Sequence, residues 1–319
     1  MTTATLLLGA FVADAASLGV HWIYDPARIA EIAARQGGRT AFTPVDAANY
    51  VGEVGYFAHE ARPSGGLSQY GEALRLAVQT MPDGRFDRAR YQAGFAAYFG
   101  PGGAYAGYID RPTRGALAKI AEGLEISGID DDQLPAISRI PAIMAGYHRD
   151  TARDAALRAA MEITNVNAAA AAYGAVFADL LGQVMEDIPL DRALRDAADR
   201  ADPAIARPLQ AALATSETGS TEFAATTGRA CHLPMAAPLI FHILRHSTGF
   251  ADAVERNNRA GGDSAGRAIL LGAIMGRIHG LAPDRGIPLG WVLQMRDAAA
   301  IWAISEQLAA AGSGTGGGT

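Results

Sequence analysis

The stretch Gly261-Gly262-Asp263-Ser264-Ala265-Gly266-Arg267 leads directly into Ala268-Ile-Leu-Leu-Gly-Ala-Ile-Met-Gly-Arg-Ile-His279-Gly280. Paired glycines and one aspartate therefore come immediately before a long apolar segment with helical spacing. The start of a helix presents unpaired backbone N–H groups and the positive end of the helix dipole. We expect the polar residues 257–266 to form a loop at this helix start, and Asp263 to face a ligand there.

Most of the chain has the same helical spacing, and alternating β-branched runs are almost absent. Asp25-Pro26 and Asp202-Pro203 each place a capping residue before a proline, an arrangement that begins helices. No long linker divides the 319 residues. We therefore predict a single all-α domain over residues 1–311 and a disordered Gly/Ser/Thr tail over residues 312–319. The predicted helices cover residues 74–80, 88–98, 114–124, 135–147, 152–163, 167–185, 190–198, 204–214, 236–244, 251–254, 265–280 and 292–310.

Composition narrows the class of protein. The formal net charge is −6 without a local basic cluster, which argues against a nucleic-acid partner. The single cysteine, Cys231, excludes an internal disulfide and suits a reducing compartment. The apolar N-terminal stretch lacks basic residues and is interrupted by Asp14, which favours a core helix over a signal peptide. We expect a cytoplasmic protein with no membrane partner; the oligomeric state is not predicted.

Four glycine-rich segments interrupt the helices, at residues 47–69, 99–114, 216–234 and 257–266. Each interleaves glycine with Tyr, Asp, Arg or His. In an all-α domain, loops of this composition commonly gather on one face and form the pocket. The second segment contains Tyr105. Its ring could stack on a purine or ribose, or it could cover the core, and the sequence favours neither interpretation.

Two other motifs suggest different chemistry. Gly262–Gly266 matches the G-x-S-x-G pattern of serine hydrolases, but polar residues precede it where a buried strand is needed. No acid lies between Ala265 and the last histidine, His279, so the triad order is not completed. His242 and His246 have the i, i+4 spacing of metal ligands, but no acid lies between them, and a pair on the helix surface is the favoured interpretation.

Several motifs, taken in order, resemble the ADP-ribosylglycohydrolase family. Gly9–Gly19 resembles the opening G-x-x-x-G-D-A-L-G helix of that family, and Ser68–Ala77 falls where it carries T-D-D-T. Thr164–Asn167 resembles its Thr-His/Asn turn, and Gly261–Gly266 falls on G-G-D-T-D-T. The resemblance covers most of the chain. It implies an all-α fold and hydrolysis of a glycosidic bond in an ADP-ribose-like or nucleoside-like substrate, free or attached to a protein.

The departures from the family pattern concern its two magnesium ions. Gln69 and Tyr70 stand at the two aspartates of the first motif, and Ala265 stands at the second aspartate of the last. Only Asp263 clearly survives. Magnesium needs a near-octahedral oxygen shell anchored by carboxylates, and a two-metal site needs several of them. We therefore expect no dinuclear magnesium site and predict no metal ligands or other cofactor, with a weak dependence on Mg²⁺ left open as the alternative.

The resemblance suggests roles for the remaining polar residues. Cleavage of a glycosidic bond uses a pair of carboxyl groups, and we predict Asp263 and Glu72 as that acid/base pair. Arg267 is predicted as an electrostatic clamp in place of the missing metal charge. The alternative is a non-catalytic relative that binds a nucleotide-like ligand or has a structural role, as crystallin-type members do. The predicted substrate-binding residues are Asp14, Glu53, Ser68, Gln69, Tyr70, Tyr105, Asn258 and Ser264.

Overall fold

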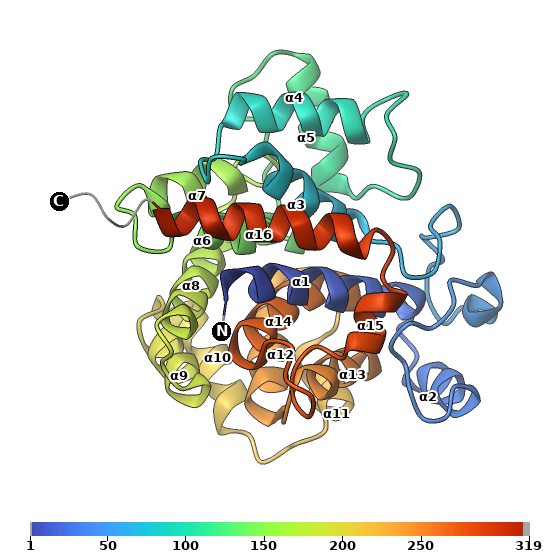
Figure 1. Cartoon of the computed structure of the whole chain (residues 1–319). Helices are drawn as coiled ribbons and strands as arrows, with labels where there is room; N and C mark the ends of the chain where they lie inside the picture. Colours follow the sequence, from blue (N-terminus) through green and yellow to red (C-terminus); the bar gives the residue numbers. More distant parts are fainter. Residues whose placement is uncertain (1, 315–319) are drawn as a thin grey trace.

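The computed structural model describes residues 2–314. Over that range the chain consists of helices and connecting turns, with three isolated β-bridges and no strand, which confirms the all-α prediction. Helix α1 (Thr3–Ser17) runs through the centre of the molecule, with α14 (Ser264–His279) packed along it (Figure 1). Helix α16 (Ala298–Gly314) lies beside α1 as well. The two ends of the chain therefore build the middle of the fold together.

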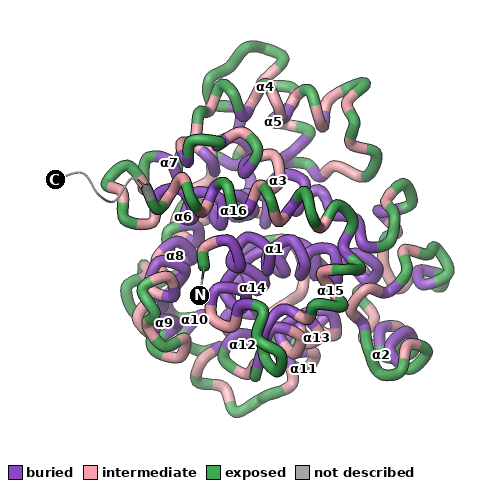
Figure 2. Tube along the Cα trace, in the orientation of Figure 1, coloured by how far each residue is buried: buried purple, intermediate pink, exposed green. Residues whose placement is uncertain are grey.

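Glycines explain why α1 and α14 lie so close. A Cβ placed on Gly272 would lie 2.5 Å from the Cβ of Ala13 and closer still to the carbonyl oxygen of Gly9. A Cβ on Gly276 would come within 3.0 Å of the Cα of Gly9. Both helices are buried along nearly their whole length (Figure 2). A helix that is apolar on all sides belongs in the core, and these two are the core around which the others pack.

The other helices surround this pair (Figure 1). Helices α4 and α5 lie together at one edge, and α9 and α10 lie at another. Their bounds are α2 (Pro26–Arg35), α3 (Gln69–Thr80), α4 (Arg88–Phe99), α5 (Arg111–Ala121), α6 (Ile140–Tyr147), α7 (Arg153–Met161), α8 (Ala168–Met185), α9 (Leu190–Asp199), α10 (Pro203–Ala214), α11 (Ser220–Thr227), α12 (Leu233–His246), α13 (Phe250–Ala260) and α15 (Leu289–Gln294). Short 3₁₀-helices cover Leu18–Val20, Ala47–Tyr50 and Leu134–Ala136.

Two predicted helices are broken where the local chemistry requires it. The helix predicted over residues 135–147 is a 3₁₀-helix followed by α6, because Pro141 lies in the first turn of a new helix. The helix predicted over residues 292–310 is α15 and α16, separated by Asp297 at a φ of 57°. Helix α11 was missed, because it is short and lies in a segment interpreted as a loop.

The predicted end of the domain at residue 311 was too early. Helix α16 continues to Gly314, so the first residues of the predicted tail are helical. A Cβ on Gly312 would lie 3.1 Å from the carbonyl carbon of Ala145 in α6, so the small residue lets α16 pack there. The rest of the predicted tail, residues 315–319, lies outside the described residues.

Two segments are long and apolar enough to cross a membrane by composition alone, Thr3–Val20 and Ala168–Met185. The first is almost completely buried as α1, as expected for the core helix of a globular domain. The second is α8, which is buried on one side only. The absence of a membrane partner stays a prediction.

Candidate functional site

The start of α14 is the centre of a buried polar cluster. Asp263 caps the helix, and its Oδ1 accepts the backbone N–H of Gly266 at 2.9 Å. Gly261 and Gly262 precede it with φ values of 75° and 66°, a conformation that favours glycine. The loop is shorter than predicted, because the helical residues of α13 continue to Ala260. The junction between α13 and α14 is thus a tight turn that buries the Asp263 carboxylate completely.

The start of α3 meets this carboxylate from the other side. Tyr70 donates its hydroxyl to Asp263 Oδ2 at 2.7 Å. Ser68, the capping residue of α3, donates its backbone N–H and its hydroxyl to Asp14 of α1, at 2.8 and 2.5 Å. All four side chains are buried. The sequence prediction that Asp14, Ser68, Tyr70 and Asp263 share one site is therefore consistent with their placement.

A third carboxylate completes the pattern. Asp110 caps α5, where its Oδ1 accepts the backbone N–H of Thr113 at 2.8 Å. Its Oδ2 accepts the side-chain amide of Gln69, and its own backbone N–H donates to Gln69 Oε1 at 2.8 Å. Three consecutive residues at the start of α3 thus each contact a different buried carboxylate. Asp110 was missed from sequence, where it stands in a glycine-rich loop without a recognised motif.

Two buried histidines extend the cluster, and sequence reasoning missed both. His21 Nε2 lies 2.9 Å from Asp263 Oδ1, and His21 Nδ1 lies 2.6 Å from His59 Nε2. The two rings are each only 2% exposed, and His59 Nδ1 has no hydrogen-bond partner among the described residues. The one signal for His21 was its place two residues beyond the opening motif. His59 comes from the glycine-rich segment before α3, where nothing distinguished it.

The three buried carboxyl groups differ in pKa, which is raised for two of them and lowered for the third. Burial raises the pKa of Asp14 to about 7 and that of Asp110 to about 6, although hydrogen bonds oppose both shifts. Burial also opposes ionisation of Asp263, but His21 and the Tyr70 hydroxyl outweigh it and lower the pKa of Asp263 to about 2. Asp263 is therefore ionised at neutral pH and has no proton to donate, whereas Asp14 and Asp110 exchange protons near neutrality.

Glu72 has different neighbours. Its Oε1 lies 2.5 Å from Arg62 Nη2, and its Oε2 lies 3.5 Å from Arg75 Nε. It lines a groove of about 220 Å³ together with Tyr98 and the residues that follow α15. In the part of the chain that the structure describes, no contact joins Glu72 to Asp263, so the predicted acid/base pair is not assembled as a pair of adjacent carboxyl groups.

The guanidinium of Arg267 is directed at the protein itself. The side chain is completely buried, and its Nε donates to Asn257 Oδ1 at 2.9 Å. Its Nη2 donates to the carbonyl of Gly261 at 2.6 Å, and its Nη1 to that of Arg229 at 3.2 Å. These contacts hold the turn before α14, and the clamp on a ligand stays a prediction. The charge still lies close enough to help to lower the pKa of Asp263.

Asn258 and Ser264 also hold the turn. Asn258 donates to the carbonyl of Ala16 at 3.3 Å, and Ser264 to that of Ser17 at 3.4 Å. Both side chains are completely buried against the end of α1. These contacts join α1 to the start of α14, and the predicted role of both residues in substrate binding stays a prediction.

The two remaining predicted residues, Glu53 and Tyr105, lie outside the buried polar cluster. Glu53 is exposed at a φ of 60°, and within residues 2–314 no hydrogen bond or ion pair joins it to the cluster, so its assignment as a binding residue stays a prediction. Tyr105 is half-buried, donates to the carbonyl of Tyr108 at 3.1 Å and lies under the guanidinium of Arg62, 5.0 Å from the ring centre. Trp22, next to His21 in the chain, packs edge-on against Tyr108 with 4.9 Å between ring centres.

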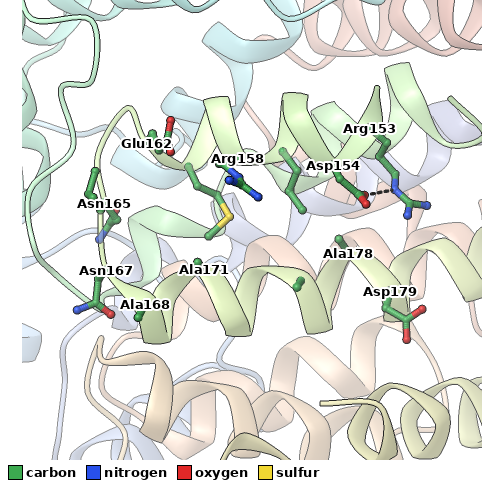
Figure 3. Close-up of a pocket in the computed structure, with 14 residues that line it drawn as sticks. Arg153, Asp154, Arg158, Glu162, Asn165, Asn167, Ala168, Ala171, Ala178 and Asp179 are labelled. Carbon is green, nitrogen blue, oxygen red and sulfur yellow. Dashed lines mark hydrogen bonds and ion pairs between the residues drawn. The ribbon is translucent and has the colours of Figure 1, made fainter. Parts of the chain in front are cut away.

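A pocket of about 580 Å³ lies elsewhere, between α7 and α8 (Figure 3). Its walls include Ala171 and Ala178 of α8 and Arg153 and Arg158 of α7. None of the predicted site residues lines it. Asn165, at one end, donates to the carbonyl of Asp131 at 2.8 Å. The buried carboxylate cluster and this open pocket are therefore separate features.

Comparison with known proteins agrees with the fold. A family model described as ADP-ribosylglycohydrolase matches residues 3–317. Among curated proteins, Crystallin J1A from Tripedalia cystophora is 24% identical over 316 residues, covering 95% of this chain and 94% of that protein. Crystallin J1B from the same organism is 23% identical, covering 90% and 89%. A solved structure titled ADP-ribosylglycohydrolase-related protein complex has a TM-score of 0.70 at 16% identity, covering 98% of this chain and 99% of its own.

Proposed function

Because this chain belongs to the ADP-ribosylglycohydrolase family, we propose that it hydrolyses a glycosidic bond in an ADP-ribose-like or nucleoside-like substrate. The observation that carries this proposal is the set of three buried carboxyl groups that contact residues 68–70 at the start of α3, with pKa values of about 2, 6 and 7. Carboxyl groups whose environments separate their pKa values are typical of acid/base sites.

We further propose that this activity needs no dinuclear magnesium centre. The support comes from the donors that surround the carboxylates. Both oxygens of Asp14, of Asp110 and of Asp263 accept hydrogen bonds from protein N–H or O–H groups. Magnesium would need several of these oxygens as ligands. The Tyr70 hydroxyl and the Gln69 amide are donors where metal-binding carboxylates would be needed, and cations would have to displace them from Asp263 and Asp110, so the residues present do not fit a two-metal site.

The contacts suggest a revised division of roles. Asp263, which remains ionised, orients His21 and stabilises positive charge near it. Asp14 and Asp110 are the groups that hold protons near neutral pH. Glu72 and Arg62 form an ion pair at the neighbouring groove, where they would contact the part of the substrate farther from the reacting bond.

The alternative is a non-catalytic relative that keeps the cluster for ligand binding or for structure. The resemblance to two crystallins over nearly the whole chain is what favours it. The two functions differ in one measurable respect, because only the enzyme turns over a bound substrate.

The first test is calorimetric titration with ADP-ribose, with and without Mg²⁺, followed by a hydrolysis assay on ADP-ribosylated arginine. We expect binding and turnover that do not change when magnesium is removed with a chelator. Binding without turnover would select the non-catalytic alternative. Turnover that disappears with the chelator would overturn the metal-independent mechanism.

The second test replaces Asp263 with Asn. We expect at least about a 100-fold loss of turnover, because the neutral side chain no longer stabilises charge on His21. Asp25→Asn is the matched control, since Asp25 also caps a helix, α2, but is partly exposed and lies outside the cluster. Unchanged turnover in D263N would remove Asp263 from the mechanism.

A further inference from the structure

The chain Asp263–His21–His59 ends in a nitrogen without a partner. The distances along it are 2.9 Å and 2.6 Å, and the three side chains are between 0% and 2% exposed. Buried polar atoms are nearly always hydrogen-bonded, to protein or to ordered water. His59 Nδ1 departs from that rule among the described residues. A water molecule bound at His59 Nδ1 would supply the missing hydrogen bond.

The hydrogen bonds determine which nitrogen carries each proton. Asp263 Oδ1 is a carboxylate oxygen, so His21 Nε2 donates to it as N–H. Only one hydrogen fits between His21 Nδ1 and His59 Nε2. With His59 Nε2 as the donor and His21 Nδ1 as the acceptor of that hydrogen, His59 Nδ1 is left with a free lone pair.

Burial and neighbouring charge favour the neutral form of His59. Burial, followed by the influence of His21 and Arg62, holds the pKa of His59 well below its usual value. A cation at His59 would be costly in this buried site beside Arg62. His59 is therefore neutral and can accept a proton on the ring nitrogen that has no partner among the described residues.

We propose that His59 Nδ1 is the general base that takes a proton from the attacking water. This inference rests on the proposed glycosidic hydrolysis and supplies a base where the family pattern has metal ions. Water oxygen bonds to the anomeric carbon as the bond to the leaving group breaks. The water proton goes to His59 Nδ1, and the Nε2 proton of His59 passes to His21 Nδ1. The resulting His21 cation is stabilised by Asp263. Reversal of these transfers returns one proton to the leaving group, so no other reactant is needed.

The test uses the full-length chain with ¹⁵N-labelled histidine. Nitrogen chemical shifts distinguish a protonated from an unprotonated ring nitrogen. In the wild type we expect His59 to carry hydrogen on Nε2 and none on Nδ1. Detection of hydrogen on His59 Nδ1 as the main form would overturn the proposal. This measurement needs no substrate, so it decides on the proton chain even if the wild type proves inactive, an outcome that would overturn the proposed hydrolysis alone.

The second arm is His59→Gln. The glutamine amide can still donate to His21 Nδ1, but no basic nitrogen remains at the Nδ1 position. We expect at least a 100-fold loss of turnover, with the affinity for ADP-ribose changed less than threefold. His148→Gln is the matched control, because His148 also pairs with a carboxylate, Glu186 at 2.6 Å, away from the cluster. Turnover of H59Q within threefold of the wild type would overturn the role of His59.

Discussion

Gly272→Ala is expected to destabilise the fold by about 3 kcal/mol or more, despite adding only one methyl group. Helix propensity alone would favour alanine here by about 1 kcal/mol. The new methyl would lie 2.5 Å from the Cβ of Ala13 and closer to the Gly9 carbonyl oxygen. Backbone on the facing helix cannot rotate away as a side chain can. Steric overlap therefore exceeds the gain in propensity, and α1 and α14 must separate.

Urea denaturation followed by circular dichroism measures this effect. Gly290→Ala is the matched control, since Gly290 is also helical, in α15, but nothing lies within 4 Å of a Cβ placed there. The control should be unchanged or stabilised by about 0.5–1 kcal/mol. A G272A variant as stable as the control variant would mean that the two central helices are farther apart than described.

Much of the fold could be predicted because its signals are local. Helical spacing of apolar residues and capping pairs such as Asp25-Pro26 depend on a few neighbouring residues, and both mark helices that the structure contains. The boundaries were harder. The predicted domain end at residue 311 left Gly312 outside the last helix. In the structure Gly312 is part of α16 and packs closely against Ala145 of α6, a long-range contact that no local sequence signal marks.

The site could be predicted where a motif marked it. Asp263 and Tyr70 are about 190 residues apart in sequence, and the order of the family motifs was what indicated that they meet. His21 and His59 carried no such mark, because a hydrogen bond between distant loops leaves no spacing in the sequence. Arg267 shows what a motif leaves open. The motif places it beside Asp263, but a buried guanidinium can serve a ligand or the backbone, and the sequence does not show that it donates to the Gly261 carbonyl and Asn257.

Asp14→Asn is expected to make the protein more stable at pH 8 than the wild type, by about 2–4 kcal/mol. Burial raises the pKa of Asp14 from 3.8 to about 7. Below pH 4 the folded and unfolded chains both hold the proton, and the group costs nothing. As the pH rises towards 7, the unfolded chain ionises first, so this group progressively favours unfolding. Above pH 7 the full cost is present, and asparagine avoids it.

The geometry suits the substitution, because an asparagine oxygen can accept the Ser68 N–H while its NH₂ donates to the Ser68 hydroxyl. Urea denaturation at a series of pH values between 4 and 8 measures the difference. The two proteins should match near pH 4 and diverge above it. The free energy of unfolding of D14N should still fall slightly as the pH rises, because the pKa of Asp110 is also raised by burial. The exposed capping residue Asp46 provides a control, D46N, that should keep the wild-type pH profile. If D14N were less stable than the wild type at pH 8, the ionised Asp14 would be a stabilising group, and the raised pKa on which the proposed proton-holding role depends would be wrong.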